Sequence, residues 1–151
     1  MKYIKTHENF IKNIFRKKFN LPNNVTELCD KITILFGEIF NEKLSYKFEK
    51  THHYYDYPLE FTVYSINFKV DNILLFKVDY YDSFSEKMNK LKFDFEPEWI
   101  TKQYEIFIDF LINLFADNLN DLYILNIDLS KLTRDEYEKF LINKDAKKYN
   151  L

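Results

Sequence analysis

Two short segments of the chain combine tyrosines with carboxylates: Tyr54-Tyr55-Asp56-Tyr57 and Asp79-Tyr80-Tyr81-Asp82. If the flanking strands form a hairpin around Asp71-Asn72, each residue pairs with the one equally far from the turn, so the numbers of two paired residues sum to about 143. A β-bulge shifts this pairing by one residue. Both segments then fall at the same end of a sheet. Tyrosine is enriched among interface hot spots, and carboxylates steer a charged partner. The sequence therefore predicts a protein-binding surface formed by Tyr54, Tyr55, Asp56, Tyr57, Asp79, Tyr81 and Asp82.

Some of these tyrosines have an alternative place in the hydrophobic core. Tyr80 shares the strand parity of Leu74, Phe76 and Val78, which are typical of an inward-facing row. The segments would then form an ordinary tyrosine-rich sheet edge.

Histidine and carboxylate side chains offer a second chemistry, that of a metal-assisted hydrolase using His52 or His53 with Asp56, Asp79 or Asp82. Neighbouring histidines on an extended segment point to opposite sides, so both do not readily bind one ion. Asp79 and Asp82 also differ in parity and share a face only if the strand ends between them. We therefore expect no catalytic residue, metal ion or other cofactor, and keep the hydrolase as an alternative.

The single cysteine, Cys29, and the single glycine, Gly37, exclude several classes of site. One cysteine forms neither a disulfide framework nor a cysteine zinc cluster, and one glycine cannot build a glycine-rich phosphate loop. Cys29 lies beside Asp30, whereas a reactive thiolate needs nearby positive charge, so we expect a small, partly buried apolar side chain. Gly37 interrupts a helical pattern, and we expect a close contact between helices there.

The formal net charge of −2 is unevenly distributed along the chain. Residues 1–50 carry ten basic and six acidic side chains, whereas residues 51–140 carry nine and seventeen. This acidic middle argues against direct nucleic-acid binding and suits a basic protein partner. The sequence contains no apolar segment typical of a signal peptide or a membrane span, which favours a cytoplasmic protein without membrane contact.

Hydrophobic periodicity predicts a single α+β domain over residues 1–151. Intervals of three and four predict two N-terminal helices, one from Thr6 to Phe19 and one that Asn24 begins with Glu27 in a capping box. The period then changes to two, which indicates an antiparallel β-meander of four strands with a bulge at Tyr64-Ser65.

The second half of the chain predicts two further helices and one strand. Pro97 suits the first turn of a long, mostly buried helix over 97–118, packed on the sheet. One further strand is expected over 122–129, followed by a C-terminal helix that Thr133 and Glu136 cap.

These observations predict a small inhibitor of the immunity or antitoxin type, a monomer or weak dimer. It would block the active site of a basic enzyme, such as a nuclease toxin, with its acidic and tyrosine-rich surface. Three alternatives stay open: a phage- or plasmid-encoded inhibitor of a host defence complex, the hydrolase, and an oligomeric structural domain suggested by the aromatic content of 19%.

Overall fold

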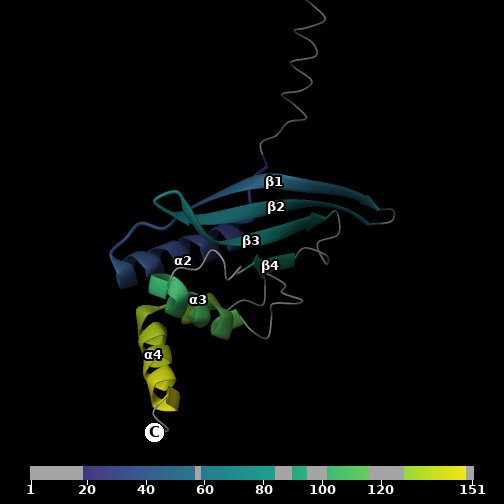
Figure 1. The fold of residues 1–151 in the computed structure, drawn as a ribbon. Helices are drawn as coiled ribbons and strands as arrows, with labels where there is room; N and C mark the ends of the chain where they lie inside the picture. Colours follow the sequence, from purple (N-terminus) through teal and green to yellow (C-terminus); the bar gives the residue numbers. More distant parts are fainter. Residues whose placement is uncertain (1–18, 57–58, 84–89, 95–101, 116–127, 149–151) are drawn as a thin grey trace, which may run out of the picture.

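The computed structural model describes residues 19–56, 59–83, 90–94, 102–115 and 128–148. Three α-helices and a four-stranded antiparallel meander make up this part of the chain (Figure 1), which confirms the predicted α+β class. In chain order the elements are α2 (Asn23–Phe40), β1 (Ser45–Asp56), β2 (Leu59–Val70), β3 (Ile73–Ser83), β4 (Lys90–Asp94), α3 (Lys102–Phe115), the 3-10 helix η5 (Leu129–Lys131) and α4 (Arg134–Lys148).

The helices lie on one side of the sheet, with α2 and α3 against its strands and α4 next to α3 (Figure 1). We call the covered side, which carries Ile66, Phe68 and Val78, the inner face, and the opposite side the outer face. All three of these side chains are buried in the core. Aromatic rings join the layers, because Phe93 of β4 stacks on Phe115 of α3 at a centroid distance of 4.9 Å.

Helix α2 buries a stripe of apolar side chains at intervals of three and four, as predicted. The helix begins at Asn23, since the carbonyl of Pro22 accepts hydrogen bonds from the amides of Val25 and Thr26, both at 3.0 Å. The predicted start at Asn24 is therefore wrong by one residue, and Asn24 lies inside the first turn. The helix ends at Phe40, and the next residue, Asn41, caps it in a left-handed conformation. The buried stripe consists of Val25, Leu28, Cys29, Ile32, Leu35 and Phe36.

The turn between β2 and β3 is the predicted pair Asp71-Asn72, with φ values of 49° and 66°. Two consecutive positive φ values match the twist of a tight hairpin. The predicted bulge at Tyr64-Ser65 is wrong, because the register shifts occur in the neighbouring strands of β2. Thr51 is the extra residue in β1, and Leu75 is the extra residue in β3. The change of apolar phase along β2 instead reflects a central strand that is buried on both faces near its middle.

Helix α3 and helix α4 confirm two of the predicted helices, with different bounds for the first. The structure describes α3 over Lys102–Phe115 of the predicted 97–118, and α3 exposes one side, including Ile106 at 39%. At the start of α4, the hydroxyl of Thr133 accepts a hydrogen bond from the amide of Glu136 at 3.2 Å, which is half of the predicted capping box.

Two predicted elements are not part of the described fold. The described residues contain one helix before the sheet rather than two, and the predicted helix from Thr6 lies almost entirely outside them. The described sheet has four strands rather than five. The predicted strand over 122–129 also lies almost entirely outside the described residues, and its last residue, Leu129, begins the 3-10 helix η5, which an aspartate side chain caps.

Gly37 does not mark a close contact between helices within the described residues, so that prediction is wrong. A Cβ built on Gly37 meets one atom within 4 Å, the carbonyl oxygen of Glu42 at 3.6 Å, which is an ordinary van der Waals contact. The glycine therefore carries a cost in helix propensity without a packing requirement among the described residues.

We predict that Gly37→Ala raises the free energy of unfolding by about 0.5–1 kcal/mol, since alanine favours the helical backbone. Urea unfolding followed by circular dichroism measures the change. Glu38→Ala, at the next and exposed position, is the matched control and should change stability by less than about 0.5 kcal/mol. A destabilised Gly37→Ala variant would mean that an alanine side chain does not fit at this position.

Tyr104 connects α3 to the segment between α2 and β1. Its hydroxyl donates a hydrogen bond to the carboxylate of Glu42, and the amide of Gln103 donates to the same carboxylate at 3.0 Å. The hydrogen bond to Glu42, followed by burial, raises the pKa of Tyr104 to about 12. The ring is buried while the hydroxyl reaches a partly solvated partner, so the bond is weaker than it would be in the core.

We predict that Tyr104→Phe lowers the free energy of unfolding by roughly 1 kcal/mol at pH 7. Because the folded-state pKa lies above the unfolded value near 10, this contribution is complete below about pH 10 and disappears as the pH rises through about 12. Urea unfolding at a series of pH values measures the difference between the two chains.

A double-mutant cycle with Glu42→Gln supplies the control for that prediction, because Tyr104→Phe should cost less once the carboxylate is gone. Equal costs in both backgrounds, or a difference that persists above pH 12, would contradict the assigned hydrogen bond.

Candidate functional site

The register of the sheet places the two tyrosine- and aspartate-containing segments at the same end. Asp56 of β1 pairs with Leu59 of β2, and Thr62 of β2 pairs with Asp82 of β3. The β2–β3 pairing differs by one residue from the sum of 143, which is the shift expected from a bulge. The prediction that both segments lie at one end of the sheet is therefore confirmed.

The same register separates Asp79 from Asp82. Strand β3 continues through both residues to Ser83, and its pairing with β2 is regular between Ser65–Asp79 and Thr62–Asp82. Successive side chains of a strand alternate between faces, so residues three apart lie on opposite sides. Asp79 and Tyr81 therefore lie on the outer face and Asp82 on the inner face. The seven predicted contact residues do not share one face.

On the outer face, Asp79 and Tyr81 lie beside two residues of the central strand. The hydroxyl of Ser65 donates a hydrogen bond to Oδ1 of Asp79 at 2.7 Å, and Val63 pairs with Tyr81. Val63 and Ser65 are each 6% exposed, while Asp79 and Tyr81 are half-buried. We call these four residues the outer-face site. It combines a carboxylate held by a hydroxyl, a phenol and an apolar centre.

Two members of the outer-face site, Val63 and Ser65, are absent from the predicted contact set. The register contains the signal for them, because moving the predicted pairing by one residue brings Ser65 opposite Asp79. Composition gives no such signal, since valine and serine are common in any sheet.

On the inner face, Asp82 lies among tyrosines and has a desolvated carboxylate. Burial raises the pKa of Asp82 above its ordinary value. Burial also raises the pKa of Tyr64 and Tyr80, with the nearby Asp82 charge as the next cause, and that of Tyr80 reaches about 12. Tyr80 is 1% exposed, so the alternative that places it in the core is confirmed.

The remaining predicted contact residues belong to β1 and to the segment after it. Tyr54, Tyr55 and Asp56 are part of β1, where positions 54 and 56 have the parity of Tyr81 and position 55 that of Asp82. Tyr57 lies outside the described residues.

The groups suggested for a hydrolase are distributed over both faces. His53 and Asp82 occupy one inner-face row, with Thr62 between them, and Nδ1 of His53 lies 2.5 Å from the hydroxyl of Thr62. Two strand spacings, about 10 Å, separate the backbones of His53 and Asp82. Asp79 lies on the opposite face. Among the described residues, no three His, Cys, Asp or Glu side chains are placed to hold one metal ion.

Cys29 is more deeply buried than expected, at 1% exposed. Burial, and then the neighbouring charge of Asp30, raises the pKa of the Cys29 thiol to about 12. The thiolate form that a nucleophile requires is therefore strongly disfavoured.

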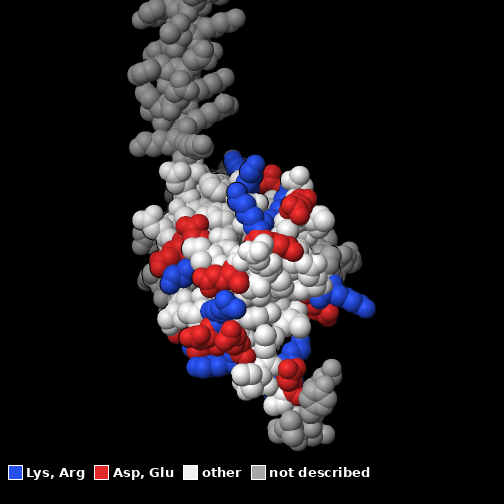
Figure 2. Space-filling model, turned by 90° about the vertical axis from the view of Figure 1, so that its left-hand side faces the viewer, with Lys and Arg blue, Asp and Glu red and all other residues white. Residues whose placement is uncertain are grey.

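The outer face carries charges of both signs instead of a continuous acidic surface. Lys77 and Asp94 form an ion pair there at 3.9 Å. Figure 2, which views the end of the molecule that carries the β2–β3 turn, also shows acidic and basic side chains interspersed. Five of the seventeen acidic residues in the segment 51–140 belong to the described helices: Glu105, Asp109, Asp135, Glu136 and Glu138.

Comparisons with models of protein families, with curated proteins and with solved structures find no match for this chain. Among the helices that the structure describes, none has both the length and the apolar character that a membrane span requires.

We predict that Asp82→Asn is more stable than the wild type at pH 7. Because burial raises the folded-state pKa, the carboxylate begins to cost stability as the pH rises through its lower unfolded-state pKa, and this cost is complete above the folded-state pKa. The amide carries no charge and has no such cost. The difference should vanish toward about pH 3, where the carboxyl group is protonated in both states.

Thermal or urea unfolding across this pH range measures the effect. Asp79→Asn is the matched control, because it keeps an acceptor for Ser65 and should gain no stability. An Asp82→Asn variant that is less stable at pH 7 would show that the carboxylate has a stabilising partner.

Proposed function

We propose that this protein is a protein-binding inhibitor of the immunity or antitoxin type, which blocks a basic enzyme such as a nuclease toxin. The outer-face site would form the centre of the contact. The single observation that carries this proposal is the Ser65–Asp79 hydrogen bond on a sheet face that no described helix covers.

The Ser65 hydroxyl supports recognition because it fixes the Asp79 carboxylate before any partner arrives. Ordering a side chain on binding costs about 0.5–1.5 kcal/mol, and a group that is already held avoids part of this cost. One carboxylate oxygen accepts from Ser65, and a basic side chain of the partner could bind the other.

The half-buried Tyr81 supplies the aromatic part of the proposed contact, with Val63, which is only 6% exposed, as its neighbour across the strands. Binding hot spots combine a desolvated centre with an aromatic anchor, and charged groups around them steer the encounter. By register, positions 54 and 56 extend the outer-face row toward the end of β1, which adds a second tyrosine and a second aspartate. Asp82 and Tyr55, which have the other parity, are left out of this contact.

The experiment compares three baits in a pull-down from the source cell: the wild type, the double variant Asp79→Ala/Tyr81→Ala, and Asp82→Asn. The captured protein is identified by mass spectrometry, and its enzymatic activity is then titrated with each bait. We expect the wild type and Asp82→Asn to capture and inhibit the same basic enzyme. The double variant should bind at least about tenfold more weakly, as loss of hot-spot residues does.

The association rate of the wild-type complex should also fall steeply with salt concentration. Equal binding by the double variant would contradict the outer-face site. Full activity of the captured enzyme at saturating bait would contradict inhibition.

A further inference from the structure

Strand β1 forms one edge of the described sheet, whose order is β1-β2-β3-β4 (Figure 1). Alternate backbone amides and carbonyls of an edge strand point away from its only neighbour and can pair with another strand. The register with β2 is regular from Ser45 to Lys50, before the extra residue Thr51. This regular segment is the part of the edge that is suited to continue the sheet.

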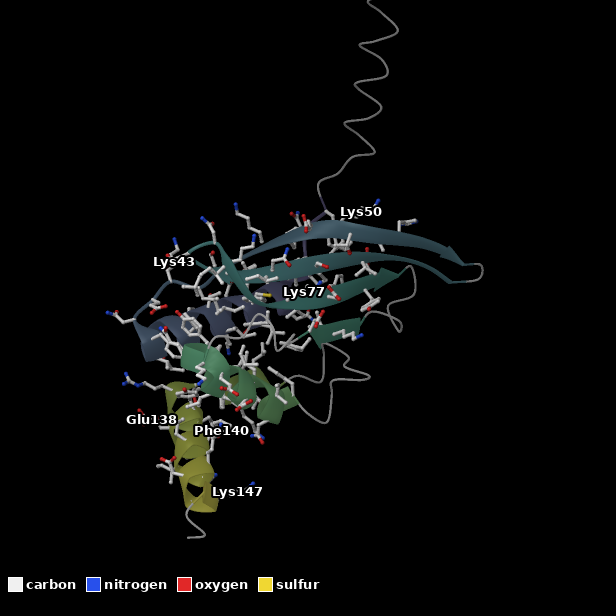
Figure 3. The ribbon with its side chains drawn as sticks, in the orientation of Figure 1. Lys43, Lys50, Lys77, Glu138, Phe140 and Lys147 are labelled. Atoms are coloured by element: carbon white, nitrogen blue, oxygen red, sulfur yellow. The ribbon has the colours of Figure 1, made fainter. Side chains whose placement is uncertain are left out.

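The segment carries accessible side chains, both charged and aromatic. Lys47, Glu49 and Lys50 are exposed, and Phe48 keeps 37% of its surface exposed despite edge contacts with Phe19 and Tyr64. Figure 3 shows Lys50 on β1 at this edge of the sheet. The ion pairs found among the described residues use neither Lys47 nor Glu49. In the sequence, the aromatic residue Phe48 thus lies between two accessible side chains of opposite charge, Lys47 and Glu49.

We propose that two copies of the chain pair through β1, antiparallel, with the two-fold axis at Phe48. Around that axis Lys47 of each copy lies opposite Glu49 of the other, which gives two cross-strand ion pairs on the outer face. The two Phe48 rings lie opposite each other on the inner face, where aromatic pairs stabilise neighbouring strands. The occupant of the edge is therefore a second copy of this chain.

Charge selects this register over its neighbours. A two-fold axis perpendicular to an antiparallel pair passes through one residue position, so the nearest alternatives centre on Lys47 or on Glu49. The first places the two Lys47 side chains opposite each other and the second places the two Glu49 carboxylates together, and directly opposed like charges are destabilising. The pairing centred on Phe48 avoids both repulsions.

The paired sheet would contain eight strands, with β1 of each copy at its centre. Because the axis is perpendicular to the sheet, both outer faces remain on the same side. The two outer-face sites would then face the same direction, although the pairing does not depend on the proposed inhibitor function.

Charge reversal in the full chain tests this pairing. In Lys47→Glu two acidic pairs replace the ion pairs, and in Glu49→Lys two basic pairs replace them. We expect each variant alone to dimerise at least about tenfold more weakly than the wild type. An equimolar mixture of the two variants restores both ion pairs, as does the double variant Lys47→Glu/Glu49→Lys, so dimers should return in both samples.

Sedimentation equilibrium at low salt, up to about 1 mM chain, detects weak pairing of this kind. Lys69→Glu is the matched control, because it makes the same charge change on β2, away from the edge, and should dimerise like the wild type. Restoration by mixing also excludes misfolding as the cause of a lost dimer. A monomeric wild type throughout this range, dimers insensitive to both reversals, or a mixture that stays monomeric would overturn the proposal.

Discussion

The pairing of β2 with β3 determines which side chains reach the core and which reach solvent. Strand β2 is the central partner of β1 and β3, and side chains alternate along it with a period of two. With Ser65 opposite Asp79, the residues Ile66, Val78 and Tyr80 point toward the helices and are almost fully buried. A shift of one residue would move every side chain of β3 to the other face. The aromatic and aliphatic core therefore fixes this register, and the register fixes the outer-face site.

The helices complete this arrangement from one side. Many of the described aromatic side chains pack within α2, α3 and the sheet. Examples are Phe36 with Phe107, whose ring centroids are 5.3 Å apart, and Phe68 with Phe76, at 4.5 Å. Polar side chains lie at the margin of this hydrophobic core. Ser65 and Asp79 satisfy each other on the outer face, whereas Asp82 stays partly desolvated on the inner face. This contrast is why Asp79 belongs to the proposed contact and Asp82 serves as its control.

Local signals in the sequence predict much of the described fold. Three predicted features depend on residues close in the chain, and the structure contains all of them. They are the apolar spacing from Val25 to Phe36, the Asp71-Asn72 turn and the Thr133 cap. The bulges depend on contacts between strands. Thr51 and Leu75 are the extra residues in the pairings of β1 and β3 with β2, so the alternation within β2 alone does not locate them.

The candidate site is also only partly predictable from the sequence, because strand parity can be read locally and cross-strand partners cannot. Parity shows that Asp79 and Asp82 share a face only if β3 ends between them, and the strand continues to Ser83. The length of β3 depends on its pairing with Phe61 and its neighbours in β2, which no local pattern in β3 reveals. Ser65 illustrates the same limit, because its role follows from the residue opposite it.

Cross-strand nuclear Overhauser effects between backbone protons test the β2–β3 register most directly. We expect contacts between Ser65 and Asp79 and between Tyr64 and Tyr80, in an isotope-labelled sample of the full chain. Contacts that instead join Tyr64 to Asp79 would place Asp82 on the uncovered face and Asp79 toward the helices, and would contradict the proposed surface.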